Sequence, residues 1–179
     1  MTTQPAVPAK VDLVVPMSNL LALDQSSHCT GWAVFQDKQL HTFGHFTFDD
    51  EDIGLRLLKI REKVKSLIIE YKIDEVVFED IQLQSNVLNN VKTFKILAEV
   101  FGVIYELVTE LQIPNDAVLS SVWKSTLGIK GKSRPEQKRN AQQFVVSTYK
   151  VKPTQDESDA ICIGTHYLTQ KQEVFDWSL

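Results

Sequence analysis

The chain has 179 residues, of which 43% are hydrophobic and 23% are charged, and this composition is ordinary for one globular domain. No apolar run reaches the ~18 residues of a membrane span, and the N-terminus lacks the basic and apolar stretches of a signal peptide. We therefore expect a cytoplasmic protein without membrane contact. The two cysteines, Cys29 and Cys162, lack the spacing of a metal site, which predicts two reduced thiols.

Residues 1–17 contain three prolines and no hydrophobic period, so we expect a flexible arm or leader ahead of one folded domain, residues 18–179. Short apolar and aromatic runs predict an antiparallel meander of three strands, at 19–24, 32–35 and 40–48. An amphipathic helix at 53–68 and a strand at 75–79 follow, which predicts a right-handed parallel crossover.

The rest of the chain reads mainly as helix. The pattern predicts helices at 88–111, 121–127, 135–149 and 157–170, with a short strand at 117–119 between the first two. This order predicts an α/β domain with a mixed five-stranded sheet flanked by helices on both faces.

Acidic residues stand at three separated points where these elements end or begin. Asp24 ends the first strand, Glu79 ends the fourth, and Asp156 and Asp159 share one face at the start of the last helix. The carboxyl ends of neighbouring parallel strands meet at one edge of a sheet, where ligands bind in open α/β folds. Each acid alone is typical of a turn or a helix N-terminus, but their joint placement predicts a carboxylate cluster.

Clustered carboxylates repel one another unless a cation joins them, and oxygen ligands favour Mg²⁺ or Mn²⁺ over Zn²⁺. Two such ions about 3.5–4 Å apart can hold the attacking and leaving oxygens of a phosphoryl displacement. We therefore expect Asp24, Glu79, Asp156 and Asp159 to be catalytic ligands of two Mg²⁺ ions, with Mn²⁺ as a substitute.

The net charge is −4, but the segment from Lys124 to Arg139 has six basic residues against one acid. It carries +5, which leaves −9 on the rest of the chain. Such a strip suits local phosphate contacts, and it suits a solvated helix face equally well. The residues that we expect to contact nucleic acid are Lys124, Lys130, Lys132 and Arg134.

Several of these motifs resemble those of RuvC-type Holliday junction resolvases. Residues 23–33 (LDQSSHCTGWA) resemble the first strand and turn of that family, and residues 76–79 (VVFE) resemble its second acidic strand. Residues 156–161 (DESDAI) are similar to the D-x-x-D-A-[IL] motif that opens its last helix. Residues 121–132 resemble its lysine-bearing segment. The likeness spans nearly the whole chain after Met17, and the order and spacing of the motifs make it specific.

The resemblance implies an RNase H-like fold, a homodimer, and Mg²⁺-dependent hydrolysis of two opposed strands of a four-way DNA junction, leaving 5′-phosphate ends. It assigns the four acids as metal ligands and Lys124 and Lys132 as phosphate contacts. Three features depart from the family pattern. Asp80 follows Glu79 where a neutral residue is usual, and the loop at 81–86 lacks an aromatic wedge. The long helix at 88–111 lacks the small-residue-rich stretch of bacterial members. These departures suit a bacteriophage-type branch that acts on branched DNA in the cytoplasm of a bacterial host.

Three other interpretations remain. An actin-like ATPase would need a second domain and a second glycine-rich turn, and this chain is short with only seven glycines. A nuclease of the same fold acting on RNA–DNA hybrids would use the same acids. A non-catalytic module that binds branched DNA would keep a relic of the site.

Overall fold

The computed structural model describes residues 18–82 and 87–176 of the chain. The predicted arm at 1–17 and most of the loop at 81–86 lie outside these ranges, so both remain predictions. Within the described ranges, no helix combines the length and the apolar character needed to cross a bilayer.

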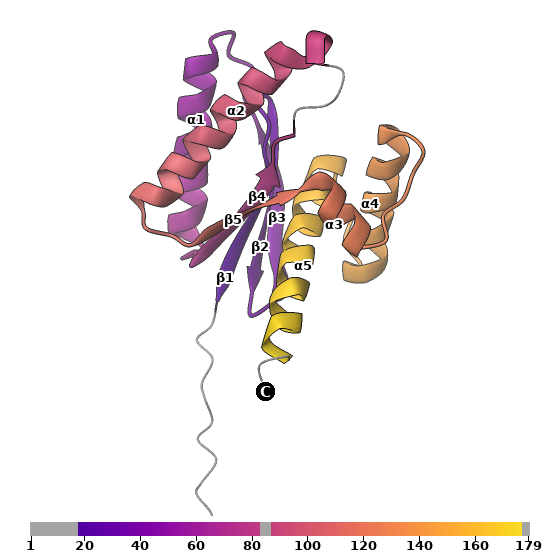
Figure 1. Ribbon diagram of the computed structural model, residues 1–179. Helices are drawn as coiled ribbons and strands as arrows, with labels where there is room; N and C mark the ends of the chain where they lie inside the picture. Colours follow the sequence, from indigo (N-terminus) through magenta and orange to yellow (C-terminus); the bar gives the residue numbers. More distant parts are fainter. Residues whose placement is uncertain (1–17, 83–86, 177–179) are drawn as a thin grey trace, which may run out of the picture.

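Five strands form one mixed sheet in the order β3-β2-β1-β4-β5 (Figure 1). The strands are β1 (Asn19–Asp24), β2 (Cys29–Gln36), β3 (Gln39–Thr47), β4 (Glu75–Asp80) and β5 (Asn115–Leu119). The first three form the predicted antiparallel meander, whereas β4 pairs in parallel with both β1 and β5. The mixed five-stranded sheet predicted from the sequence is therefore confirmed.

The central strand β1 is buried on both faces, which explains its unbroken apolar run. Leu20 and Ala22 pack into one hydrophobic core, and Leu21 and Leu23 pack into a second core on the other side. This division follows from the two-residue period of a strand, because successive side chains point to opposite faces. Two cores of this kind require helices on both sides of the sheet.

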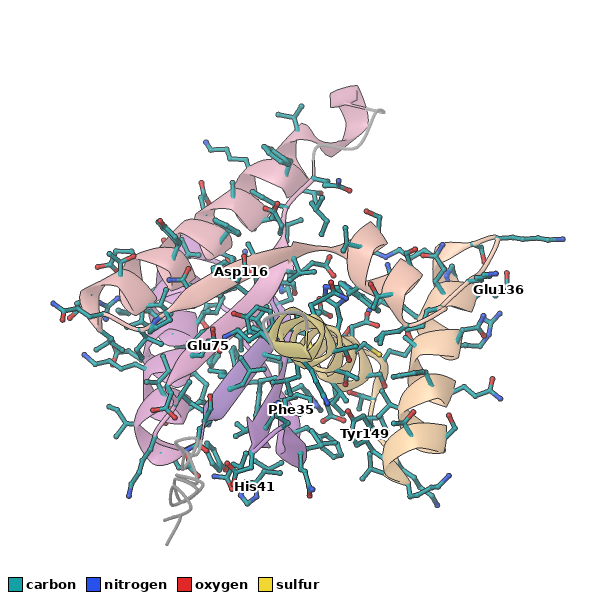
Figure 2. All side chains as sticks on the ribbon, turned by 60° about the horizontal axis from the view of Figure 1, so that its bottom comes forward. Phe35, His41, Glu75, Asp116, Glu136 and Tyr149 are labelled. Carbon is teal, nitrogen blue, oxygen red and sulfur yellow. The ribbon has the colours of Figure 1, made fainter. Side chains whose placement is uncertain are left out.

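Helices cover both faces of the sheet, as predicted (Figure 1). The helices are α1 (Ile53–Glu70), α2 (Val87–Glu110), α3 (Ser120–Thr126), α4 (Arg134–Tyr149) and α5 (Gln155–Asp176). α1 and α2 lie on one side, and α3, α4 and α5 lie on the other. The view along α5 shows this helix seated between the sheet and α4 (Figure 2). Phe35 of β2 and Tyr149 of α4 meet there in a T-shaped contact, with ring centroids 6.4 Å apart.

Two elements, β2 and α5, are longer than the sequence pattern predicts by more than two residues. β2 begins at Cys29 rather than Trp32, because Cys29 and Gly31 pair with β3 although their own side chains give no strand signal. α5 spans 155–176 rather than 157–170. Its added residues are mainly polar, so hydrophobic periodicity could not mark them.

The close packing of α5 on the sheet depends on Gly164. A Cβ atom at this position would lie 2.3 Å from Cε2 of Phe35 and 3.0 Å from Cβ of Ala22, both fully buried. We expect Gly164→Ala to lower the free energy of unfolding by about 1–3 kcal/mol, because overpacking forces neighbours to shift. The matched control is Gly102→Ala in α2, where a Cβ meets no atom within 4 Å. That change should raise stability by about 0.5–1 kcal/mol, and urea unfolding of both variants measures the contrast. Equal effects would contradict the packing argument.

Candidate active site

Asp24 and Glu79 lie side by side at the carboxyl ends of two parallel strands. Leu23 of β1 pairs with Phe78 of β4, so the residue that follows each one reaches the same edge of the sheet. The side chain of Gln25 holds these ends together. Its Nε2 donates to the carbonyl oxygen of Glu79 at 2.5 Å, and its Oε1 accepts from the Glu79 N–H at 3.1 Å. The two acids are therefore neighbours because β1 and β4 are paired and because Gln25 bonds to the backbone of Glu79.

The first turn of α5 brings the other two acids to this edge. A capping box fixes the turn: Oγ1 of Thr154 accepts from the N–H of Glu157 at 3.3 Å, and Oε2 of Glu157 accepts from the N–H of Thr154 at 2.6 Å. Gly31 of β2 allows the turn to approach the sheet, because a Cβ there would lie 2.1 Å from the carbonyl oxygen of Asp156. Asp156 and Asp159 therefore sit on a helix start that is anchored at both the cap and the sheet.

A cavity of about 370 Å³ opens at this edge of the sheet. Three of the four predicted acids line it: Asp24, Glu79 and Asp159. The basic residues in its lining are Lys124, Lys132, Arg134 and Lys138. Asp156 is outside the lining and joins the group through Lys138. The structure thus places three of the separated acids and four basic residues of the 124–139 segment around one cavity.

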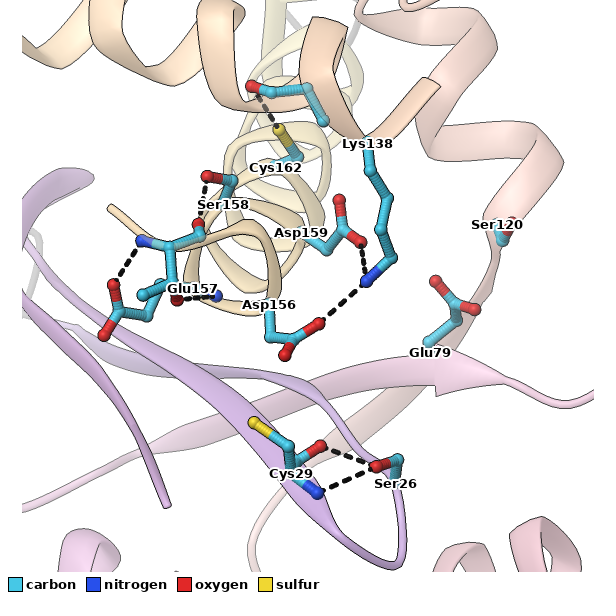
Figure 3. Close-up of polar contacts among 12 residues, drawn as sticks. Ser26, Cys29, Glu79, Ser120, Lys138, Asp156, Glu157, Ser158, Asp159 and Cys162 are labelled. Atoms are coloured by element: carbon cyan, nitrogen blue, oxygen red, sulfur yellow. Dashed lines mark hydrogen bonds and ion pairs between the residues drawn. The ribbon is translucent and has the colours of Figure 1, made fainter. Parts of the chain in front are cut away.

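Lys138 of α4 forms ion pairs with Asp156 and Asp159, the two predicted ligands on α5 (Figure 3). Its Nζ lies 2.7 Å from Oδ1 of Asp156 and 3.4 Å from Oδ2 of Asp159. These carboxylates differ in exposure, because the side chain of Asp159 is 9% exposed and that of Asp156 is 35% exposed. The ammonium group therefore stands between two of the predicted metal ligands.

Glu79 has a partner of its own in the core. The indole N–H of Trp123 donates to Oε2 of Glu79 at 3.0 Å, and Trp123 is fully buried. Lys124 lies over the Trp123 ring, 5.0 Å from Nζ to the ring centroid, and donates to Oγ of Ser120 at 2.9 Å. Helix α3 thus orients Glu79 through Trp123 and places the ammonium group of Lys124 at the wall of the cavity.

The acids perturb one another in the direction expected of a crowded carboxylate cluster. Burial raises the pKa of Asp24 well above its usual range, and the charges of Asp159 and Glu79 raise it further. Burial also raises the pKa of Glu79 and of Asp159, against the opposing influence of Trp123 on the first and Lys138 on the second. The metal-free cluster thus favours bound protons.

Asp156 and Lys138 shift in the opposite sense, since each stabilises the charge of the other. Burial alone would raise the pKa of Asp156, but its hydrogen bond from Lys138 lowers it. Burial alone would lower the pKa of Lys138, but the neighbouring carboxylates of Asp156, Asp159 and Asp24 raise it. Both groups are therefore charged at neutral pH.

Burial and the nearby Asp156 raise the pKa of the Cys29 thiol to about 12, in keeping with an unreactive reduced cysteine.

The chemistry of the site suits a hard divalent cation, although the side chains do not form a cage. Four carboxylates supply oxygen ligands only, and Oδ1 of Asp159 is buried without a hydrogen-bond partner. Yet among residues 18–82 and 87–176 no group of three or more His, Cys, Asp or Glu side chains is arranged to hold a metal ion. The oxygen donors are therefore of the type that a divalent cation prefers, but two of the four carboxylates are paired with Lys138.

The structure separates the four basic residues that the sequence groups together. Lys124, Lys132 and Arg134 line the cavity beside the acids. Lys130 instead lines a separate hollow between residues 127–130 and α4, with Asn140 and Phe144 among its neighbours.

Three contributors escaped the sequence prediction. Lys138 lies in the basic strip, but the strip gives no sign that this residue faces α5. Gln25 and Trp123 act on Glu79 through contacts more than forty residues apart in sequence, for which no local signal exists. The capping box had a readable signal, because Thr154 and Glu157 have the T-x-x-E spacing.

The sequence matches no protein-family model, and it matches none of the curated proteins. Solved structures do resemble the fold. RuvC of Thermus thermophilus in complex with a Holliday junction substrate is 14% identical, with a TM-score of 0.68 over 87% of this chain and 96% of that one. The Holliday junction resolvase of yeast mitochondria is 11% identical, with a TM-score of 0.58 over 87% of this chain and 80% of that one.

A viral structure gives a similar result. Fowlpox virus resolvase, in complex with Holliday junction DNA, is 12% identical, with a TM-score of 0.57 over 86% of this chain and 98% of that one. At these identities the likeness concerns the fold. The chain has the RNase H-like fold seen in RuvC, as the sequence motifs predict.

Proposed function

We propose that this protein is a Mg²⁺-dependent endodeoxyribonuclease that resolves Holliday junctions and related branched DNA. The observation that carries the proposal is the convergence of Asp24, Glu79 and Asp159 on one cavity whose other wall is basic. The resemblance of the fold to three Holliday junction resolvases supports it. The bulk of the chain is acidic, so a polyanion would be drawn to this one face.

Each side chain has a proposed role in hydrolysis that leaves a 5′-phosphate. Asp24, Glu79, Asp156 and Asp159 would hold two Mg²⁺ ions, which when bound stabilise charge on the reacting phosphate oxygens. Trp123 fixes the orientation of Glu79, and Gln25 keeps Asp24 and Glu79 adjacent. Lys124, Lys132 and Arg134 would grip the DNA phosphates next to the acids.

We infer that the nuclease acts as a homodimer, because paired cuts on opposed strands of a junction require two active sites. Activity in the cytoplasm of a bacterial host, with a bacteriophage origin of the chain, remains the prediction made from the departures at Asp80 and the 81–86 loop.

A cleavage assay with three labelled substrates tests the proposal. A synthetic four-way junction, a linear duplex and an RNA–DNA hybrid are each incubated with the protein in Mg²⁺, in Mn²⁺ or in EDTA. We expect symmetric paired nicks in the junction alone, dependent on the divalent ion and bearing 5′-phosphates. Cleavage of the hybrid alone would replace the proposal with a ribonuclease of the same fold.

One observation favours a second candidate, a non-catalytic module that binds branched DNA. The described carboxylates do not form a ready metal cage, and a lysine is paired with two of them. Junction binding that is equal in Mg²⁺ and in EDTA, with no cleavage in either, would support this candidate.

Lys132 and Lys130 offer a matched pair for testing the DNA surface. Both are exposed lysines two positions apart, but only Lys132 lines the cavity that contains the acids. We expect Lys132→Ala to weaken junction binding and to reduce the slope of log K against log salt by about 1, because one phosphate contact is lost. Lys130→Ala should change the slope less. Fluorescence anisotropy at several salt concentrations measures both, and an unchanged slope for Lys132→Ala would remove it from the interface.

A further inference from the structure

Lys138 lies between two of the carboxylates that we assign as metal ligands. Its Nζ is 2.7 Å from Asp156 and 3.4 Å from Asp159, and the side chain comes from α4, a different element from either acid (Figure 3). Among the described residues, it is the only cation that forms an ion pair with any of the four predicted ligands. Lys124 lines the same cavity but is hydrogen-bonded to Ser120 instead.

We propose that the Lys138 ammonium group is the resident cation of the acid cluster in the metal-free protein, and that it competes with the divalent ion for Asp156 and Asp159. Lys138 is then a positioning residue that sets metal affinity. This inference rests on the proposed function, since it takes the same carboxylates as metal ligands.

The surroundings of Lys138 allow such an exchange. The side chain is 23% exposed and lines the cavity, so its head can move into open space without disrupting the core. Oδ1 of Asp159 remains buried and without a partner even with Lys138 in place. The single ammonium group therefore leaves a buried carboxylate oxygen of the cluster unpaired, and this oxygen could coordinate a divalent ion.

The competition also explains why the described acids form no cage. Asp156 points to Lys138 and does not line the cavity occupied by the other three acids. Release of Lys138 would free its carboxylate to join them. Two cations cannot share these oxygens at low cost, because like charges at such distances repel strongly in a partly buried site.

The test is Mn²⁺ binding to full-length protein without DNA, measured by titration calorimetry. We expect Lys138→Met to lower the Kd for Mn²⁺ about tenfold, because the metal ion no longer competes with an ammonium group for the two carboxylates. The melting temperature of the metal-free variant should fall, and its gain on adding Mn²⁺ should exceed that of the parent protein. A merely structural lysine would instead give weaker Mn²⁺ binding when removed, and that result, or an unchanged Kd, would overturn the proposal.

Two further variants control for charge. Lys150→Met removes the same charge at the other end of α4, about 18 Å along the helix, and should leave the Kd within about twofold of the parent value. Lys138→Arg keeps a cation in place and should not reproduce the tenfold gain. Should Lys138→Met fail to fold, the Nζ signal of Lys138 in NMR spectra of ¹⁵N-lysine protein gives the answer. It should shift on Mg²⁺ titration, whereas an unshifted signal alongside Mg²⁺ binding at the cluster would overturn the exchange.

Junction cleavage by the parent protein separates the two proposals. Tighter Mn²⁺ binding by Lys138→Met, with no cleavage by any form, would support the inference and sink the nuclease. Cleavage by the parent protein with an unchanged Kd in Lys138→Met would sink the inference alone. Absence of Mn²⁺ binding in every form would overturn both.

Discussion

Replacing Asp24 with asparagine is expected to abolish junction cleavage and, at the same time, to stabilise the metal-free protein. Cleavage should fall by about a thousandfold or more, because a carboxylate at the centre of the proposed metal cluster is lost. The free energy of unfolding without metal should rise, because asparagine cannot ionise, whereas burial and the neighbouring acids oppose ionisation of Asp24 and raise its pKa. Opposite effects on activity and stability are the signature of a functional residue, because a structural residue would lose both.

The measurements are a junction cleavage assay and urea unfolding in EDTA. Asp80→Asn is the matched control, since Asp80 lines the same cavity but accepts a hydrogen bond from the N–H of Ile81. We expect this control to keep most of the cleavage activity and to gain little stability. Junction binding by Asp24→Asn should survive or tighten, because a carboxylate without metal repels phosphate. Normal cleavage by Asp24→Asn would remove Asp24 from the site.

The pH dependence of stability checks the same physical cause. Asp24, Glu79 and Asp159 have raised pKa values, so the folded protein binds more protons than the unfolded chain between about pH 4 and those raised values. The stability of the metal-free protein should therefore fall as pH rises through this window. Asp156, whose pKa is lowered, contributes in the opposite direction, but that contribution is lost only below about pH 4. In Asp24→Asn the decline should be shallower.

The sequence predicted the strands well because their signal is local. Leu20 to Leu23 form a short apolar run that is typical of a strand buried on both faces, and the structure divides them between two cores. The positions of Asp24 and Glu79 followed from strand topology, because a parallel pair with a helical crossover must bring both ends to one edge.

What the sequence could not predict depends on contacts between distant elements. Helix 135–149 was expected, but its hydrophobic stripe is weak, so nothing indicated that Lys138 would face α5. No sequence pattern marked Trp123 as a partner of Glu79, because their hydrogen bond depends on how α3 packs against the end of β4. The sequence predicted that Asp156 and Asp159 share one face of the last helix. In the structure Asp159 lines the cavity, whereas Asp156 lies outside the lining and is paired with Lys138.

Gly31→Ala is expected to have the largest combined effect on stability and activity among the glycine substitutions. A new Cβ would lie 2.1 Å from the carbonyl oxygen of Asp156 and 2.4 Å from its carbonyl carbon. Both are backbone atoms in the first turn of α5, so no side-chain rotation can relieve the clash. The helix start must move away from β2, which should lower the free energy of unfolding by about 3 kcal/mol, the upper end of overpacking costs.

The comparison with Gly164→Ala separates loss of stability from loss of site geometry. Gly164 contacts the sheet two turns further along α5, where its new Cβ would meet side chains of the core and leave the first turn in place. Both variants are assayed for cleavage and Mn²⁺ binding at a temperature where each is more than nine-tenths folded. Gly164→Ala should then keep cleavage within about tenfold of the parent protein, whereas Gly31→Ala should lose about a hundredfold or more, because displacement of reacting groups by about 1 Å has this cost. Equal activity of the two folded variants would mean that the approach of α5 to β2 serves packing alone, and that the position of Asp156 does not matter for the chemistry.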